Sequence, residues 1–291
     1  MEIQIGTPLY PARLASIDKP PVKLYCAGDV GLLSQPKLIA VVGSRHPTAY
    51  GLEATRHIVR GLVGEGWVVV SGLAEGIDGA AHREAIAAGG RTIAVVGSGL
   101  DVVYPPTHEE LWRRIAAEHC LITEYPAGTP PNAGQFPQRN RILSGLAMGV
   151  VVIEAAEKSG ALITAQLALQ QGREVFAVPG PIFSKTSCGT NSLISQGAKL
   201  VRNAGDIVGE FVWNVGRLRA NADGVSESQD RSDMTSDQKV IYSLLEGLPL
   251  SVDEIAERTH LEIESLSVLL TELELLGKIR REAGNIFSNI P

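Results

Sequence analysis

The 291-residue chain is poor in cysteine, in aromatic residues and in net positive charge. Its three cysteines show no Cys-x-x-Cys spacing, which argues against a disulfide framework and against a zinc knuckle. No apolar run reaches the roughly 18 residues of a membrane-spanning helix, and the N-terminus lacks the basic and apolar regions of a secretory signal. These absences favour a protein of the reducing cytoplasm, with no metal site and no membrane partner.

Charge is distributed unevenly along the chain. The whole sequence holds 26 Lys and Arg against 32 Asp and Glu, a net charge of −6. Residues 235–291 hold five of the basic residues and ten of the acidic ones, so this short stretch carries most of the excess. A non-specific duplex-DNA-binding protein usually has bulk positive charge. If nucleic acid is the ligand, the positive potential must therefore be confined to a groove.

Short Val- and Ile-rich segments alternate with helical segments through the middle of the chain. Continuous apolar strands between helices predict a mainly parallel sheet that is covered on both faces, as in α/β, Rossmann-like, doubly wound domains. Ligands of such sheets bind at the carboxyl ends of the strands. The glycine-rich segments expected to gather at that edge are Gly43-Ser44-Arg45, Ser71-Gly72, Gly97-Ser98-Gly99 and Pro179-Gly180.

Composition divides the chain into four parts. Residues 1–36 are expected to pack on the main domain, and residues 37–216 to form the Rossmann-like domain. Residues 217–235 have almost no large apolar side chain, which predicts a flexible linker. Residues 236–291 predict three helices followed by a short two-stranded wing, the pattern of a small winged-helix domain.

The loop Gly43-Ser44-Arg45 is the first candidate site. It follows a predicted strand and precedes a helix, so its glycine permits close backbone approach and the helix start favours an anion. Arg45 can bind a phosphate bidentately. The alternative is that Arg45 forms a salt bridge over the loop. The loop matches neither a Walker motif nor a dinucleotide fingerprint, since Gly97-Ser98-Gly99 also lacks the third glycine of that fingerprint.

A second candidate site precedes the strand at residues 149–155. The stretch Phe136 to Arg141 combines an aromatic ring with cations, which is the minimum set for binding single-stranded nucleic acid. At least one of Arg139 and Arg141 is expected to reach the crevice. The alternative places Phe136 in the core and pairs one arginine with Glu154 or Glu124. Lys158-Ser159, at the next helix start, also suits a phosphate.

Nothing in the sequence specifies a catalytic reaction. Asp78 and His82 stand four residues apart and suit an acid–base pair, although a helix cap with a neighbouring imidazole explains them equally well. No serine lies in a Gly-x-Ser-x-Gly motif, and no clustered carboxylates indicate a metal site. The chain is therefore expected to have no catalytic residue and no cofactor.

Taken together, six segments resemble the DprA/Smf family of DNA-processing proteins. They run in the family's order from about Tyr10 to Val208. This resemblance implies an extended Rossmann fold that binds single-stranded DNA through residues 37–216 and forms homodimers through that domain. It also implies protection of incoming DNA and loading of the RecA recombinase in natural transformation, without catalysis or metal. The segments are "YPARLASIDKPPVKLYCAGD", "VVGSRHPTAYG", "SGLAEGIDGAAH", "FPQRNRILSGL", "EAAEKSGALITAQLALQQGREVFAVPG" and "GTNSLISQGA".

The resemblance also marks the candidate DNA-binding residues. The arginines and the lysine are assigned to phosphates and the phenylalanine to a base. The positions that match the family's motifs are Gly43, Ser44, Arg45, Phe136, Arg139, Asn140, Arg141 and Lys158, to which the helix-start argument adds Ser159.

Two departures from the family pattern stand out. Many members carry a helical domain before the Tyr-Pro segment, whereas nine residues precede Tyr10 here. The candidate recognition helix of the winged-helix domain, residues 262–276, holds four glutamates and no Lys or Arg, so phosphates would be repelled from it. The domain is expected to contact another protein or to pack on the main domain. Only Lys278, Arg280 and Arg281 are suited to touch DNA in that domain.

Two other functions remain open at this level. One is an enzyme that binds or hydrolyses a small nucleotide, as in the related cytokinin-activating phosphoribohydrolases. Their Pro-Gly-Gly-x-Gly-Thr loop is missing here, because the corresponding segment at residues 154–165 lacks the double glycine. The other is a transcription factor that reads DNA through its C-terminal domain, which the acidic helix disfavours.

Overall fold

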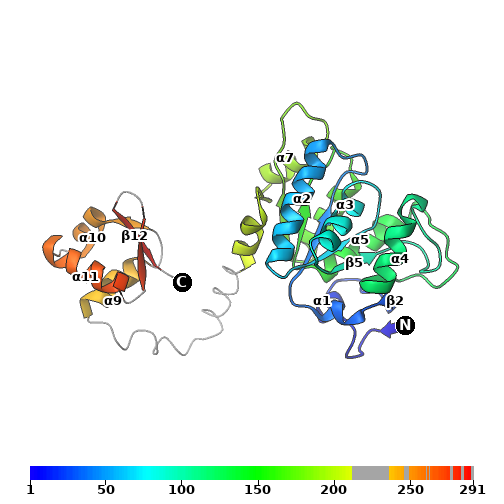
Figure 1. Ribbon diagram of the computed structural model, residues 1–291, viewed down its shortest axis with the longest axis horizontal. Helices are drawn as coiled ribbons and strands as arrows, with labels where there is room; N and C mark the ends of the chain where they lie inside the picture. Colours follow the sequence, from blue (N-terminus) through cyan, green and yellow to red (C-terminus); the bar gives the residue numbers. More distant parts are fainter. Residues whose placement is uncertain are drawn as a thin grey trace. The chain divides into compact units, whose positions relative to one another are not determined.

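The structure, a computed structural model, describes residues 1–211, 236–245, 249–259, 261, 263–275, 278–282 and 285–289. The chain forms two compact units, Met1–Val215 and Gly216–Pro291 (Figure 1). The linker predicted at residues 217–235 lies outside the described residues. Among the helices of the described parts, none combines the length and the apolar character needed to cross a membrane.

A nine-stranded sheet forms the centre of the first unit, in the order β1-β2-β6-β5-β4-β3-β7-β8-β9. The strands from β6 to β9 in that order are parallel, and β1 and β2 add antiparallel pairs at one edge. The predicted α/β, doubly wound, mainly parallel fold is confirmed. The strands are β1 Glu2–Gln4, β2 Lys23–Gly28, β3 Leu38–Val42, β4 Val68–Ser71, β5 Thr92–Val95, β6 Cys120–Thr123, β7 Gly149–Val152, β8 Glu174–Ala177 and β9 Lys199–Leu200.

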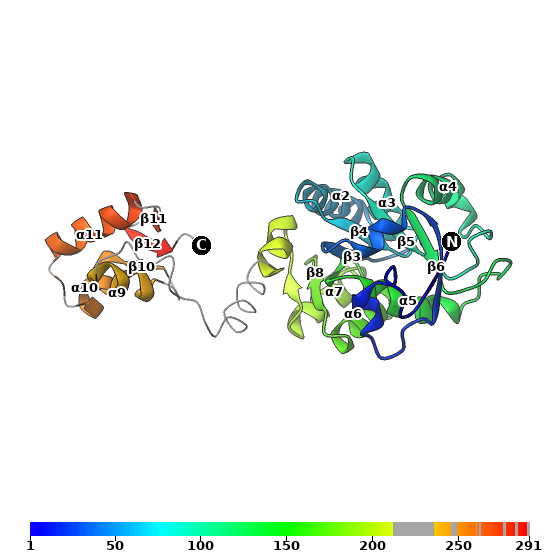
Figure 2. The ribbon, with the colours of Figure 1, turned by 90° about the horizontal axis from the view of Figure 1, so that it is seen from below.

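Helices cover both faces of this sheet. Figure 2 shows α2, α3 and α4 on one side and α5 and α6 on the other. Their bounds are α1 Ala12–Ala15, α2 Ala49–Gly64, α3 Ile77–Ala87, α4 Glu109–Glu118, α5 Gln135–Leu146, α6 Gly160–Gln170 and α7 Cys188–Ser195, with a further helical stretch at 204–211 and two 3-10 turns at Val30–Ser34 and Pro106–His108.

The two cores explain why β3 is apolar at every position. Leu38, Ala40 and Val42 face the core beneath α1, α5 and α6, whereas Ile39 and Val41 face the core beneath α2 and α3. Successive side chains of a strand point to opposite faces, so a strand that is covered on both faces needs no polar position. All five residues of β3 are buried.

The strand order reverses between β3 and β7. From β3 the chain proceeds through β4 and β5 to β6 on one side, and from β7 through β8 to β9 on the other. The connections that leave the carboxyl ends of β3 and β7 therefore diverge. In open α/β sheets such a switch point leaves a crevice that binds ligands.

The second unit is a winged helix, as the sequence predicts. Its three-stranded sheet has the order β10-β12-β11, so the wing carries one strand more than the predicted two. Its core includes Ile241, Ile255, Leu266 and Phe287. The elements are α9 Ser236–Leu244, β10 Leu250–Ser251, α10 Val252–Thr259, α11 Ile263–Leu275, β11 Ile279–Glu282 and β12 Ile286–Asn289.

The candidate recognition helix α11 is acidic where its side chains are described. Glu272 and Glu274 are exposed, and Glu272 accepts a hydrogen bond from Gln238 Nε2 at 2.7 Å. Glu262 lies outside the described residues.

A buried histidine links the stability of the first unit to pH. His82 is fully buried on α3, and its Nδ1 lies 2.6 Å from the Thr92 hydroxyl oxygen. That hydroxyl donates its hydrogen to the Val69 carbonyl oxygen, so Nδ1 must be the donor and Nε2, which has no partner, is the site left to protonate. Burial lowers the pKa of His82 to about 3, helped by His108 and Arg83.

We expect acid to destabilise the protein through this imidazole. Between pH 6.5 and pH 3 the unfolded chain binds a proton at His82 that the folded chain does not bind, so stability is present above this range and is lost as pH falls. The loss from pH 7 to pH 5 is about 2 kcal/mol. In urea unfolding, His82→Asn, which keeps the donor to Thr92 but cannot ionise, should remove this component. The exposed His57→Asn should not, and an equal pH dependence of wild type and His82→Asn would contradict the assignment.

Candidate functional site

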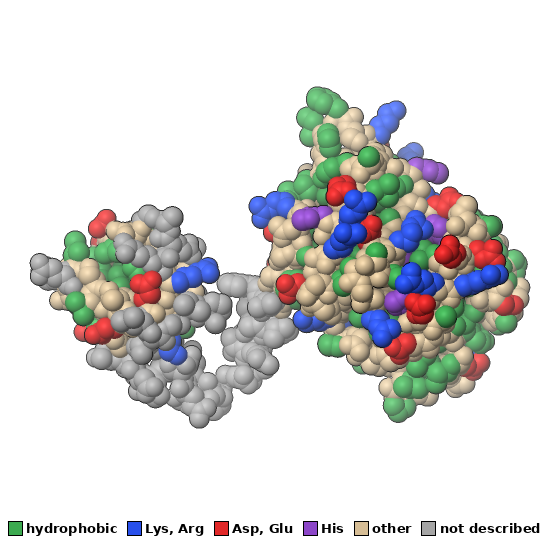
Figure 3. All heavy atoms as spheres, in the orientation of Figure 1, with side chains coloured by type: hydrophobic (Ala, Val, Ile, Leu, Met, Phe, Trp, Pro, Cys, Tyr) green, Lys and Arg blue, Asp and Glu red, His purple; other side chains and the backbone are tan. Residues whose placement is uncertain are grey.

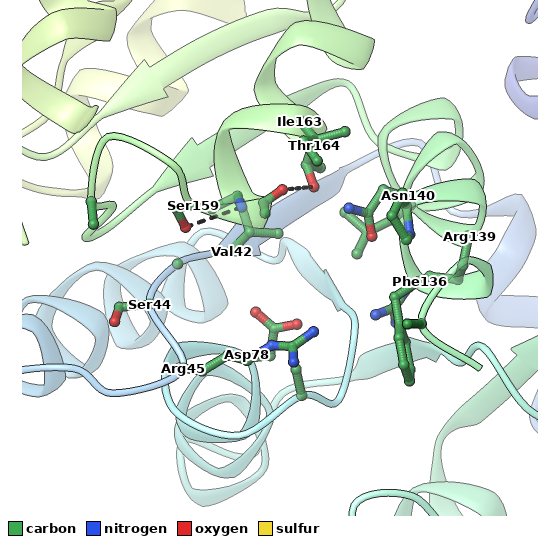
Figure 4. Close-up of a pocket in the computed structure, with 18 of the residues that line it drawn as sticks. Val42, Ser44, Arg45, Asp78, Phe136, Arg139, Asn140, Ser159, Ile163 and Thr164 are labelled. Carbon is green, nitrogen blue, oxygen red and sulfur yellow. Dashed lines mark hydrogen bonds between the residues drawn. The ribbon is translucent and has the colours of Figure 1, made fainter. Parts of the chain in front are cut away.

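A cavity of about 570 Å³ lies at the switch point. Figure 4 shows its walls: the loop after β3 on one side, α5 on the other, and the start of α6 above. These segments are distant in sequence and meet because the carboxyl ends of β3 and β7 are neighbours. The residues that line the cavity include Gly43, Ser44, Arg45, Asp78, Tyr104, Phe136, Arg139, Asn140, Ser159, Gly160 and Thr164.

Arg45 is the exposed cation of this cavity. Its guanidinium carbon lies 5.7 Å from the centroid of the Phe136 ring, a cation–π distance. The Phe136 ring in turn stacks on Tyr104, with centroids 5.4 Å apart and planes at 30°. Among the ion pairs of the described residues, none involves Arg45, so the alternative salt bridge over the loop does not form. Its charge faces solvent in the cavity.

The start of α2, where many Rossmann-like proteins bind a phosphate, is already filled by a carboxylate of the protein. Glu154 is 2% exposed. It accepts hydrogen bonds from the Thr48 backbone nitrogen at 2.9 Å, the Thr48 hydroxyl at 2.6 Å and the Thr186 hydroxyl at 3.1 Å. A Cβ atom at Gly51 would collide with the Glu154 carboxylate. A nucleotide phosphate at this helix start would meet a negative charge, which disfavours the small-nucleotide enzyme.

The start of α6 is open to the cavity instead. Ser159 caps the helix, and its hydroxyl oxygen accepts a hydrogen bond from the Ala161 nitrogen at 3.3 Å. Ser159, Gly160 and Ala161 all line the cavity. Lys158 is exposed in the turn just before this helix and is not among the lining residues. The positive end of the α6 dipole and Arg45 therefore face the same space.

Arg139 lies differently from the sequence-based assignment to a phosphate. It is 4% exposed, and its NH1 donates to the Gly72 carbonyl oxygen at 2.6 Å and to the Val95 carbonyl oxygen. These bonds tie α5 to the ends of β4 and β5. A Cβ atom at Gly72 would lie 2.6 Å from the guanidinium nitrogens and from Asp78 Oδ2, so the position requires glycine.

Asp78 balances this buried guanidinium. Its Oδ2 accepts a hydrogen bond from the Gly72 nitrogen at 3.1 Å. Burial raises the pKa of Asp78 to about 6, against the opposing effect of Arg139, and burial lowers the pKa of Arg139 to about 10, against the opposing effect of Asp78. Asp78 lies in the first turn of α3, which is capped by Gly76, and His82 bonds to Thr92. Neither the predicted cap nor the acid–base pair with His82 is formed.

Asn140 and Arg141, the other candidate residues that follow Phe136 on α5, lie in different surroundings. Asn140 is half-buried and lines the cavity. Arg141 points elsewhere, with its NH2 2.5 Å from Glu124 Oε2, which is the pairing that the sequence left open as an alternative. Seven of the nine candidate residues thus line one cavity, and Arg141 and Lys158 are outside its lining.

Tyr104 is a site residue that sequence reasoning missed. It lies in the connection after β5 and completes the stack with Phe136. Its position in the sequence could have indicated this role, because the connection after β5 leaves the carboxyl end of a parallel strand, as the Gly43-Ser44-Arg45 loop after β3 does.

On the face that Figure 3 shows, the Lys and Arg side chains of the described residues are interspersed with Asp and Glu. Over α2, α3 and α4 several exposed arginines are paired, Arg56 and Arg60 with Glu84 and Arg113 with Glu109. Arg83 of α3 is exposed and is not part of an ion pair among the described residues. In the described residues, no group of three or more His, Cys, Asp or Glu is placed to hold a metal ion.

A crevice at the switch point of a doubly wound sheet, with a free guanidinium, two stacked rings and an open helix start, is typical of Rossmann-like proteins that bind phosphate-bearing ligands. Comparison with known families is more specific. A family model described as DNA recombination-mediator protein A matches residues 2–212, and one described as DprA winged helix domain matches residues 225–285. The chain belongs to the DNA recombination-mediator protein A (DprA) family.

Individual relatives agree with this assignment. The chain is 48% identical over 209 residues to DNA processing protein DprA of Bacillus subtilis (strain 168), covering 72% of this chain and 70% of that protein. It is 38% identical over 283 residues to Protein Smf of Escherichia coli (strain K12), covering 97% and 75%.

Solved structures of the family superimpose on the first unit's fold. The X-ray structure of DprA from Streptococcus pneumoniae aligns with a TM-score of 0.70 and 45% identity, covering 72% of this chain and 74% of that one. DNA processing protein A from Helicobacter pylori, described by its single-stranded DNA binding mode, aligns with a TM-score of 0.66 and 31% identity, covering 74% and 97%.

Proposed function

We propose that the chain is a non-enzymatic, cytoplasmic protein that binds single-stranded DNA in the switch-point cavity, protects it, and delivers it to RecA during natural transformation. The observation that carries the proposal is the unpaired Arg45 guanidinium over the Phe136 ring, beside the open start of α6. The single-stranded DNA binding mode described for the Helicobacter pylori relative supports it.

The cavity suits a single strand better than a duplex. Arg45 and the backbone of α6 offer donors to a phosphate, whereas Phe136 offers a ring face to a base. In a duplex the base faces are already stacked and cannot reach such a ring. Ion pairs on the exterior, such as those of Arg60 with Glu84 and Arg113 with Glu109, reduce its attraction for duplex phosphates.

Homodimerisation through the first unit and transfer to RecA come from the family resemblance. Two linked cavities would raise the avidity for a long strand, since the second binding event becomes intramolecular. We place strand binding in the first unit alone and assign protein contact to the second unit, because its helix α11 presents Glu272 and Glu274 to solvent.

A binding comparison tests this division. We expect the intact chain to bind a single-stranded oligonucleotide at least about tenfold more tightly than the duplex of the same sequence. Residues 1–215, which form a compact unit of their own, should keep this affinity within about a factor of three.

The measurement is a fluorescence-anisotropy titration of both chains at fixed salt. Equal affinity for duplex and single strand would contradict the proposed function. Loss of strand binding on removal of residues 216–291 would place the interface in the winged helix instead.

A further inference from the structure

A second, smaller cavity of about 160 Å³ adjoins the first. It lies at the carboxyl ends of β4 and β5, between the Gly72–Glu75 connection and the Tyr104–Pro106 connection. The two cavities share a wall. The residues that line both are Arg45, Ala74, Tyr104, Phe136 and Arg139.

The shared wall is built from flat groups. The centroid of the Phe136 ring lies 5.7 Å from the Arg45 guanidinium carbon and 5.4 Å from the centroid of the Tyr104 ring. Rings and guanidinium planes are the surfaces on which proteins stack unpaired bases. Arg45, which is assigned to a phosphate in the first cavity, also reaches the second, so one nucleotide can contact both.

The size of the second cavity suits a single planar group. Its volume is below the roughly 300 Å³ at which pockets for larger ligands begin, so it has room for one ring system. Glu75 places a carboxylate in its lining, beside the guanidinium groups of Arg45 and Arg139. A small, flat-walled space that holds both charges suits a neutral planar group that carries hydrogen-bond donors as well as acceptors.

The second cavity offers acceptors beside the guanidinium groups of Arg45 and Arg139. Glu75 Oε1 accepts a hydrogen bond from the Thr107 hydroxyl at 3.1 Å, and a carboxylate has room for further donors. The Ser98 hydroxyl donates to the Val102 carbonyl oxygen at 2.9 Å, so its oxygen remains an acceptor. The exocyclic amino groups of cytosine, adenine and guanine are donors that a glutamate accepts, whereas thymine presents a ring N–H flanked by two carbonyl oxygens.

We propose that the second cavity receives one unstacked nucleobase of the bound strand and prefers a base with an exocyclic amino group, while Arg45 holds the adjoining phosphate. This inference rests on the proposed single-strand binding. It adds to the phosphate contact a second contact that depends on the identity of the base.

The first test compares strands of one length that differ in their bases, using the full chain. We expect a dC oligonucleotide to bind about fivefold or more tightly than dT. Glu75→Gln should bring the dC-to-dT ratio close to one with the dT affinity retained, because an amide offers a donor as well as an acceptor. Glu110→Gln, at an exposed position of α4 outside both cavities, is the matched control and should keep the ratio.

The outcomes separate the two proposals. If the wild type binds no single-stranded DNA, the proposed function fails. If it binds dC and dT equally, or if Glu75→Gln keeps the dC preference, the proposed strand binding stands and the proposed base recognition in the second cavity is overturned.

A second test removes the base and keeps the phosphate. A strand of abasic sites should bind the wild type at least about fivefold more weakly than dC of equal length. Tyr104→Ala should lose most of this difference, whereas Tyr104→Phe, which keeps the ring, should restore it. Tyr50→Ala, at an exposed tyrosine outside both cavities, controls for surface effects. Equal binding of the abasic and dC strands would overturn base recognition.

Discussion

Replacing Arg45 with alanine is expected to weaken the binding of single-stranded DNA by roughly ten- to a hundred-fold, because a hydrogen bond to a charged group contributes about 1.5–3 kcal/mol. The guanidinium is exposed, carries no ion pair among those of the described residues, and rests on the Phe136 ring. Its loss removes both the phosphate contact and one layer of the stacked wall. Titration of a fluorescent oligonucleotide measures the effect.

The salt dependence gives an independent readout of the same contact. Each phosphate neutralised on a single strand contributes about 0.7 to the slope of log affinity against log salt, so Arg45→Ala should make the slope shallower by about that amount. Arg113→Ala is the matched control, since Arg113 is exposed on α4, is paired with Glu109 and lies outside both cavities. An unchanged affinity and slope in Arg45→Ala would place the phosphate elsewhere.

The fold was predictable because its pattern is local. A parallel strand covered on both faces reads as a near-continuous apolar run, and β3 and β7 each consist of buried residues without a polar side chain. Their glycine-rich ends then had to share one edge of the sheet. The order of the strands was not predictable from such segments, since each one suits any central position.

The different surroundings of Arg139 and Arg141 follow from the face of α5 that each residue occupies. Arg139, Ile142, Leu143 and Leu146 follow the three- and four-residue spacing of one helix face, and all four are buried. This spacing was a sequence signal that Arg139 faces the interior. Which partners would satisfy it was not predictable, because Gly72 and Val95 are 67 and 44 residues away.

The place of the Glu154 carboxylate at the start of α2 was also not predictable from the sequence, because it depends on long-range contacts. Glu154 ends an apolar strand and looks like a candidate partner for a nearby arginine. Its partners are Thr48, 106 residues earlier, and Thr186, 32 residues later. Only the neighbouring positions of β3 and β7 bring these groups together, and this arrangement closes the anion site that the start of α2 would otherwise offer.

Replacing Arg139 with alanine should destabilise the fold, in contrast to Arg45→Ala. The change removes the hydrogen bonds to the Gly72 and Val95 carbonyl oxygens and leaves Asp78 buried without its cation. Removing one member of such a buried charged pair costs about 3–5 kcal/mol. Urea unfolding of residues 1–215 measures the loss, and oligonucleotide titration below the unfolding transition measures binding by the folded fraction.

The double variant identifies the cause of that loss. If the uncompensated carboxylate dominates, Arg139→Ala with Asp78→Asn should be more stable than Arg139→Ala alone, because an amide keeps an acceptor for the Gly72 nitrogen without the buried charge. Were Arg139→Ala to keep its stability and lose only strand binding, Arg139 would contact a phosphate, as the sequence motif suggested. If instead Arg139→Ala is less stable and the Asp78→Asn change restores part of that stability, Arg139 is the residue that fixes α5, and with it Phe136, against the ends of β4 and β5.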